Sequence, residues 1–102
     1  MTHANTMRTI ANNHSKKRIE AITSTASYEN VMLSINAKMI MNAEEGGTSC
    51  SFCLNTFGDE LCRETSLWTT KKERAELVGK ALMQYGYTVK VNSDFSTIMI
   101  SW

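Results

Sequence analysis

The chain has 102 residues, of which 42% are hydrophobic and 21% charged, and its formal net charge is +1. This length fits one domain over residues 1–102, and the composition excludes a mainly disordered chain. The near-neutral charge argues against capture of nucleic acid or of an anionic membrane by charge alone, so we expect neither as a partner.

The first half of the chain predicts two helices. Apolar residues recur at spacings of three and four from Met7 through Ile10 to Ile22, which is the period of an amphipathic helix. The Ser-Thr-Ala-Ser stretch at 24–27 interrupts this pattern, and Ser27 is a candidate N-cap for the second helix. The second helix carries a broader apolar stripe over residues 28–43 and is therefore predicted to be the central one, ending at the Glu-Glu-Gly-Gly stretch.

A strand is predicted from Thr48 to Asn55. Large apolar and small side chains alternate there, with Cys50, Phe52 and Leu54 on one face. The segment that follows, residues 57–68, has no clear period. Because Gly58 and Asp59 form a turn signal, we expect a short helical turn or a loop there.

The last third predicts a helix and two strands. Thr70 and Glu73 form a capping box at the start of the helix, and Gly86 stands where a helix C-terminal glycine belongs. Two alternating segments follow, 87–91 and 95–102, with a three-residue turn at 92–94 between them. These segments predict an antiparallel hairpin.

The predicted fold is therefore α+β, with the order α-α-β-α-β-β. An isolated hairpin is only marginally stable in water, so we expect the first strand to complete a small, mainly antiparallel, three-stranded sheet. The N-terminal helices and the one further helix would pack on that sheet.

All cysteines lie in residues 50–62, and they allow three interpretations. A structural zinc site would use Cys50, Cys53 and Cys62 with His14 as the fourth ligand, although zinc sites usually combine two close ligand pairs. A redox pair would place Cys-x-x-Cys at a helix start, where the helix lowers a thiol pKa. We favour the third interpretation, in which Cys50 is a core residue and Cys53 lies on the opposite face of its strand.

No residue pattern indicates catalysis. The sequence has no nucleophile motif with an attendant base, and no glycine-rich phosphate loop. The acidic pairs Glu44-Glu45 and Asp59-Glu60 are adjacent in sequence, and adjacent residues do not share a helix face. We therefore expect no enzyme, no catalytic residue and no cofactor.

Five residues are candidates for an interaction surface. Lys16 and Lys17 form a basic cluster in the first helix, although no aromatic residue is interleaved for base stacking. Met41 and Met99 are expected to be exposed, and exposed methionine suits an adaptable contact surface. Trp68 is the fifth candidate, because tryptophan is enriched at binding hot spots.

The end of the chain resembles a class of short phage-encoded proteins. In that class a helix ends in Gly-Tyr, as at Gly86-Tyr87, and a hairpin ends in Ile-Ser-Trp, as at residues 100–102. The helix end at residues 43–47 is similar to that class as well. The resemblance implies a phage origin and a small α+β fold, and it assigns no catalytic residue.

These observations predict a small, non-enzymatic accessory protein that acts by binding another protein, either a host factor or a component of a virion or of its own oligomer. Two alternatives stay open: a zinc-stabilised nucleic-acid-binding or regulatory module, and an anti-defence protein that sequesters a nucleotide signal. There is no secretory leader and no apolar run of membrane-spanning length, and the cysteine count is odd. We therefore expect a cytoplasmic protein, in the host cell if it is phage-encoded.

Overall fold

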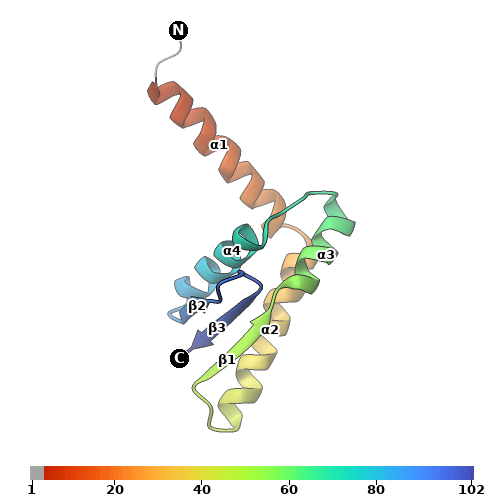
Figure 1. The fold of residues 1–102 in the computed structure, drawn as a ribbon, viewed down its shortest axis with the longest axis vertical. Coiled ribbons are helices and arrows are strands. Elements are labelled where there is room, and N and C mark those ends of the chain that lie inside the picture. Colours follow the sequence, from red (N-terminus) through yellow and green to blue (C-terminus); the bar gives the residue numbers. More distant parts are fainter. Residues whose placement is uncertain (1–3) are drawn as a thin grey trace.

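The computed structural model describes residues 4–102, which form four α-helices and one three-stranded sheet (Figure 1). The helices are α1 (Ala4–Thr23), α2 (Ala26–Glu44), α3 (Asn55–Thr65) and α4 (Lys71–Gln84). The strands are β1 (Ser49–Cys53), β2 (Thr88–Val91) and β3 (Thr97–Ser101). The predicted α+β class is confirmed, with one helix more than the sequence predicted.

The sheet has the order β1-β3-β2, and both pairings are antiparallel. The last strand of the chain is therefore the central one. Ile98 and Ile100 of β3 pair with Phe52 and Cys50 on one side and with β2 on the other. These side chains face the helices, while Met99 lies on the opposite, exposed face.

The core lies between the sheet and helices α2 and α4, which cover the same face (Figure 1). Its fully buried members come from every layer. They include Ile35 of α2, Leu61 of α3, Val78 of α4 and both inward isoleucines of β3. Burial of such side chains contributes roughly 1.5–3 kcal/mol each, so this layer supplies most of the driving force for folding.

Helix α3 was missed by the sequence analysis, which expected a turn or loop over residues 57–68. Phe57 and Leu61 lie one helical turn apart and are both buried. Gly58, which suggested a turn, instead leaves room for the Arg74 side chain of α4: a Cβ at this position would lie 2.5 Å from Arg74 Cζ. Tertiary packing thus stabilises a helix whose own propensity is weakened by glycine.

The start of α2 also differs from the prediction. Thr25, not Ser27, is the N-cap, and its hydroxyl accepts a hydrogen bond from the Tyr28 amide at 3.1 Å. Ser27 lies inside the first turn. Its amide and hydroxyl both donate to the Glu64 carboxylate of α3, at 2.8 and 2.6 Å, and the Ala26 amide donates at 2.9 Å. An acidic side chain from another helix therefore caps α2.

The predicted ends of α4 are confirmed. The Thr70 hydroxyl accepts a hydrogen bond from the Glu73 amide at 3.0 Å. Gly86 follows the helix with a φ of 93°, a left-handed conformation that favours glycine. The hairpin loop is longer than predicted. Residues 92–96 connect the strands, held by hydrogen bonds from the Ser96 amide to Asp94 and from the Thr97 amide to Asn92.

Helix α1 projects from the body of the molecule (Figure 1). Every described side chain before Arg18 is exposed, and Ile22 in the last turn is buried. The long axis of the molecule measures 60 Å. Figure 1 shows α1 and α2 meeting end to end at a marked angle, with α1 leading toward one end of the molecule and α2 toward the other.

Candidate interaction groove

The cysteines lie as the favoured interpretation predicted. Cys50 is buried in β1, whereas Cys53 of the same strand and Cys62 of α3 are exposed. Burial raises the pKa of the Cys50 thiol, although Lys38 partly opposes this shift. A thiol with a raised pKa is a poor nucleophile and a poor metal ligand.

The ligand set of the zinc alternative is not assembled in the structure. His14 is exposed on the projecting part of α1. Over residues 4–102, no group of three or more histidine, cysteine, aspartate and glutamate side chains could hold a metal ion. The described residues therefore give the zinc alternative no support.

The predicted interaction residues are exposed but do not form one surface. Lys16 and Lys17 lie on α1, Trp68 in the connection between α3 and α4, Met41 near the end of α2, and Met99 on the open face of the sheet. Their exposure was predicted, and their role in binding stays a prediction.

A groove of about 600 Å³ lies between α2 and the C-terminal end of α4. Its floor includes the buried side chains of Met39 and Leu82. Apolar and aromatic side chains form most of its walls. The wall residues are Tyr28, Met32, Leu33, Ala81, Tyr85 and Tyr87.

The rim of this groove is unusually apolar for a surface. Leu33 of α2 is 60% exposed and Tyr85, at the end of α4, is 76% exposed. A second hollow of about 190 Å³ continues the groove toward the end of α2 and shares Asn36, Met39 and Tyr87 with it. Ile40 and Trp102, both exposed, line this extension. A continuous apolar surface of this kind marks an interaction site more often than a single exposed side chain does.

The electrostatics of the groove favour a partner without negative charge. Glu29 lines its first part, and the described lining residues include no lysine or arginine. Lys38 of α2 is turned away, because its ammonium group donates a hydrogen bond to the Ser51 carbonyl of β1. Burial raises the pKa of the Tyr28 hydroxyl, and the Tyr85 phenol raises it further, so Tyr28 stays neutral at physiological pH.

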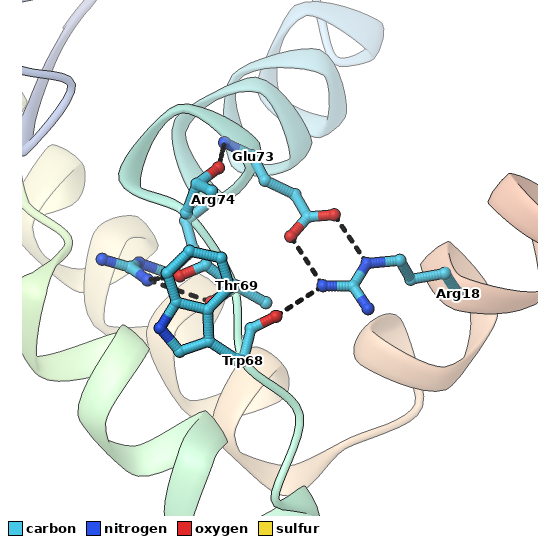
Figure 2. Close-up of polar contacts among 6 residues, drawn as sticks. Arg18, Trp68, Thr69, Glu73 and Arg74 are labelled. Carbon is cyan, nitrogen blue, oxygen red and sulfur yellow. Dashed lines mark hydrogen bonds and ion pairs between the residues drawn. The ribbon is translucent and has the colours of Figure 1, made fainter.

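A polar network at the α1–α4 contact fixes the direction of α1 (Figure 2). The Arg18 guanidinium donates to both carboxylate oxygens of Glu73, at 2.7 and 3.0 Å, and to the Trp68 carbonyl at 2.6 Å. This pairing lowers the pKa of the Glu73 carboxyl. A bidentate arginine–carboxylate pair fixes orientation as well as distance, so α1 is directed away from the groove of its own chain.

The groove was missed by the sequence analysis, although one signal was present. The second helix is apolar over much of its circumference, and this was interpreted as a central, covered position. In the structure, α3 and β1 are the elements that pack most closely on α2, and part of its circumference stays open toward α4. When the apolar stripe of a helix is wider than a small domain can cover, this pattern indicates an open interaction face.

Comparison of the chain with models of protein families, with curated proteins and with solved structures finds no match. Within residues 4–102, no helix is long and apolar enough to span a bilayer.

Proposed function

We propose that this protein is a non-enzymatic binding protein that acts through the groove between α2 and α4. The observation that carries the proposal is the mainly apolar lining of the groove, which reaches from Tyr28 to Trp102 and includes Glu29 and Asn36 as polar members. Two splayed helices over a hydrophobic floor form the kind of groove into which an amphipathic helix fits its apolar face.

The exposed aromatic side chains support this proposal. Tyrosine and tryptophan supply a large contact area with few rotatable bonds, which is why they are frequent among residues that dominate binding energy. Tyr85 and Trp102 stand at the edge of the groove and are free to contact a partner.

The alternative of a sequestered nucleotide signal has less support. The groove has aromatic rings on which bases could stack. However, a nucleotide also brings phosphates, and Glu29 is the charged residue among the described ones that line the groove. Phosphate recognition normally uses arginine, lysine or a helix N-terminus.

We propose the cytoplasm as the place of action, in a host cell if the chain is phage-encoded. The partner is then a host protein, a virion component or another copy of this chain. The resemblance to short phage proteins suggested that origin, and it stays a prediction.

Site-specific photo-crosslinking in cells tests the function. A photoreactive amino acid at Asn36, which lines both parts of the groove, is expected to yield an adduct with a protein. The matched control places the same group at Ser51, on the exposed face of the sheet. The Leu33→Glu substitution is expected to remove the adduct at position 36, since it places a charge on the apolar wall.

An adduct at position 36 that resists Leu33→Glu, or equal adducts at both positions, would contradict a binding role for the groove. The absence of any protein adduct at position 36 would contradict it as well.

A further inference from the structure

We infer that the occupant of the groove is helix α1 of a second copy of this chain, in a reciprocal dimer. This inference rests on the proposed function and names its partner. In the dimer, each α1 lies antiparallel to the partner's α2, and the two-fold axis passes near the α1–α2 junction.

One face of α1 carries two large apolar side chains that its own chain leaves uncovered. Met7 and Ile10 are 58% and 59% exposed, and Lys17 follows on the same face at helical spacing. A projecting helix of 20 residues gains little stability from propensity alone and needs a packing partner. The structure thus presents an unpartnered helix and a largely apolar groove on one molecule.

The α1–α2 junction prevents α1 from filling its own groove. Ile22 and Thr25 are buried at the junction, and the Thr25 amide and hydroxyl both donate to the Ile22 carbonyl. The bidentate Arg18–Glu73 pair holds α1 against the opposite end of α4. Folding α1 back would break these contacts, so a second chain is the available source of the helix.

Charge favours this pairing. Helix α1 carries Arg8, Lys16, Lys17 and Arg18 against the single acid Glu20, a net charge of +3. Since the whole chain is +1, the remaining residues carry −2. In the antiparallel arrangement, the basic C-terminal half of α1 lies over the first turns of the partner's α2, where Glu29 lines the groove. Lysine and glutamate then meet in a partly desolvated setting.

The lengths of the two helices match as well. Helix α1 has 20 residues and α2 has 19, so each is about 30 Å long. Because the helices meet end to end, a two-fold axis at their junction that bisects the angle between them places both copies of α1 in register at once. Met7 and Ile10 then lie over the apolar extension lined by Ile40 and Trp102.

The buried area reaches that of a stable interface. A helix about 30 Å long and about 10 Å wide has a side wall of roughly 900 Å², and a groove covers about half of it. Two reciprocal contacts, counted on both surfaces, bury roughly 1,800 Å², against about 1,600 Å² for a standard specific interface.

The test is the mass of the full chain in solution, measured by light scattering after size exclusion and by sedimentation. The wild type is expected at twice the monomer mass of 11.5 kDa. Ile10→Glu on the helix and Leu33→Glu in the groove should each weaken the dimer roughly 100-fold or more, because each buries a charge. Ser51→Glu, on the exposed sheet face, is the control and should stay dimeric. Circular dichroism and melting verify that each variant is folded.

A charge exchange tests the register. Lys17→Glu and Glu29→Lys are each expected to weaken the dimer, and the double variant to recover most of the affinity, since the opposite charges meet again. If the double variant did not recover affinity, Lys17 and Glu29 would not be in contact across the interface, and the proposed register would be wrong.

Cysteine crosslinking distinguishes this arrangement from other dimers. In a Cys53→Ser, Cys62→Ser background, Ile10→Cys combined with Ile40→Cys should form a disulfide-linked dimer on mild oxidation. Neither single variant should, because equivalent positions lie tens of ångströms apart in the proposed dimer and a disulfide requires a Cα separation below about 7 Å.

A monomeric wild type at all concentrations would overturn this inference, as would a dimer that both Ile10→Glu and Leu33→Glu leave intact. A link formed by Ile10→Cys alone would also overturn it, because two α1 helices would then pair directly. The proposed function would survive the first result if photo-crosslinking at Asn36 still captured a different protein.

Discussion

The side chains of the three cysteines differ in accessibility although they lie within 13 residues. Cys50 faces the core and Cys53 and Cys62 face solvent. This follows from the alternation of side chains along β1, which places residues 50 and 53 on opposite faces. Three residues of the same type thus occupy chemically different sites.

We expect two of the three thiols to react with a soluble disulfide reagent in the native protein. The third, Cys50, should react only on unfolding, since it is buried and burial raises its pKa. Titration of the thiols at neutral pH, first in the native protein and then in denaturant, counts the accessible thiols and the total number of thiols. The Cys50→Ala variant should retain two fast thiols and lose the slow one. Protection of all three thiols that a chelator abolishes would instead indicate a metal site.

The effect of glycine at position 58 depends on a neighbouring side chain, that of Arg74. The Arg74 guanidinium occupies the space beside it and donates from Nη1 to the Thr69 carbonyl and hydroxyl, at 2.7 and 3.0 Å. Arg74 Nε is buried without a hydrogen-bond partner among the described residues. The arginine is therefore held in one position by both shape and hydrogen bonds.

We expect Gly58→Ala to lower the free energy of unfolding by about 1 kcal/mol, because displacing Arg74 costs more than the helix propensity that alanine adds. In an Arg74→Ala background the same change should raise it by about 1 kcal/mol, since only the propensity gain remains. Urea unfolding of the four variants measures this change of sign. An equal effect in both backgrounds would show that the arginine does not restrict the site.

At the scale of the elements, α3 holds the start of α2. The Glu64 carboxylate accepts three hydrogen bonds from Ala26 and Ser27. The Ser27 hydroxyl bond is the main cause of the lowered pKa of Glu64, followed by the amides of Ser27 and Ala26. A helix that was not predicted thus supplies a cap for one that was predicted.

This cap makes stability depend on pH. The pKa of Glu64 is lower in the folded protein than in the unfolded chain. The ionised Glu64 cap therefore stabilises the fold fully above the unfolded-state pKa of about 4.3, and this stabilisation is lost as the pH falls through the folded-state pKa. We expect Glu64→Gln to be less stable than the wild type at pH 7, and the difference to shrink as the solution is acidified below about pH 4. Thermal melts across this range measure it. Glu60→Gln, an exposed change in the same helix, is the control and should show no such convergence.

At the scale of the whole molecule, the protein has a compact body and a projecting arm. The body buries its core between two helices and one face of a sheet. Among the described side chains of α1, Arg18 and Ile22, which contact the body, lie near its C-terminal end. Its stability should therefore depend on assembly more than that of any other element.

Amide hydrogen exchange tests this dependence. In the proposed dimer, residues 5–17 should be protected because the partner's groove covers α1. In Ile10→Glu, which should be monomeric, these amides should exchange close to the rate of an unprotected chain, while α2 and β3 stay protected. Ser51→Glu serves as the control with wild-type protection. Equal protection of α1 in both variants would contradict a stabilising role for the partner.

Much of the fold was predictable because its signals are local. The Thr70 cap, Gly86 and the alternation of the last strands predicted the segment from α4 to β3, apart from the length of the hairpin loop. Helix α3 and the Glu64 cap of α2 were not predictable, because Gly58 indicated a turn and because Glu64 acts across 37 residues of sequence. In both cases a distant side chain overrides the local preference.

The sequence by itself determined the α+β class, the antiparallel hairpin and the buried position of Cys50, because each depends on periodicity and on residues near one another in the chain. Only the tertiary structure decided that α2 keeps an open apolar face, that α1 points away from it, and that the predicted contact residues lie on separate surfaces. Side-chain patterns show which residues avoid water. The packing of the elements decides which of those residues the chain itself can cover. Here part of the apolar face of α2 remains uncovered.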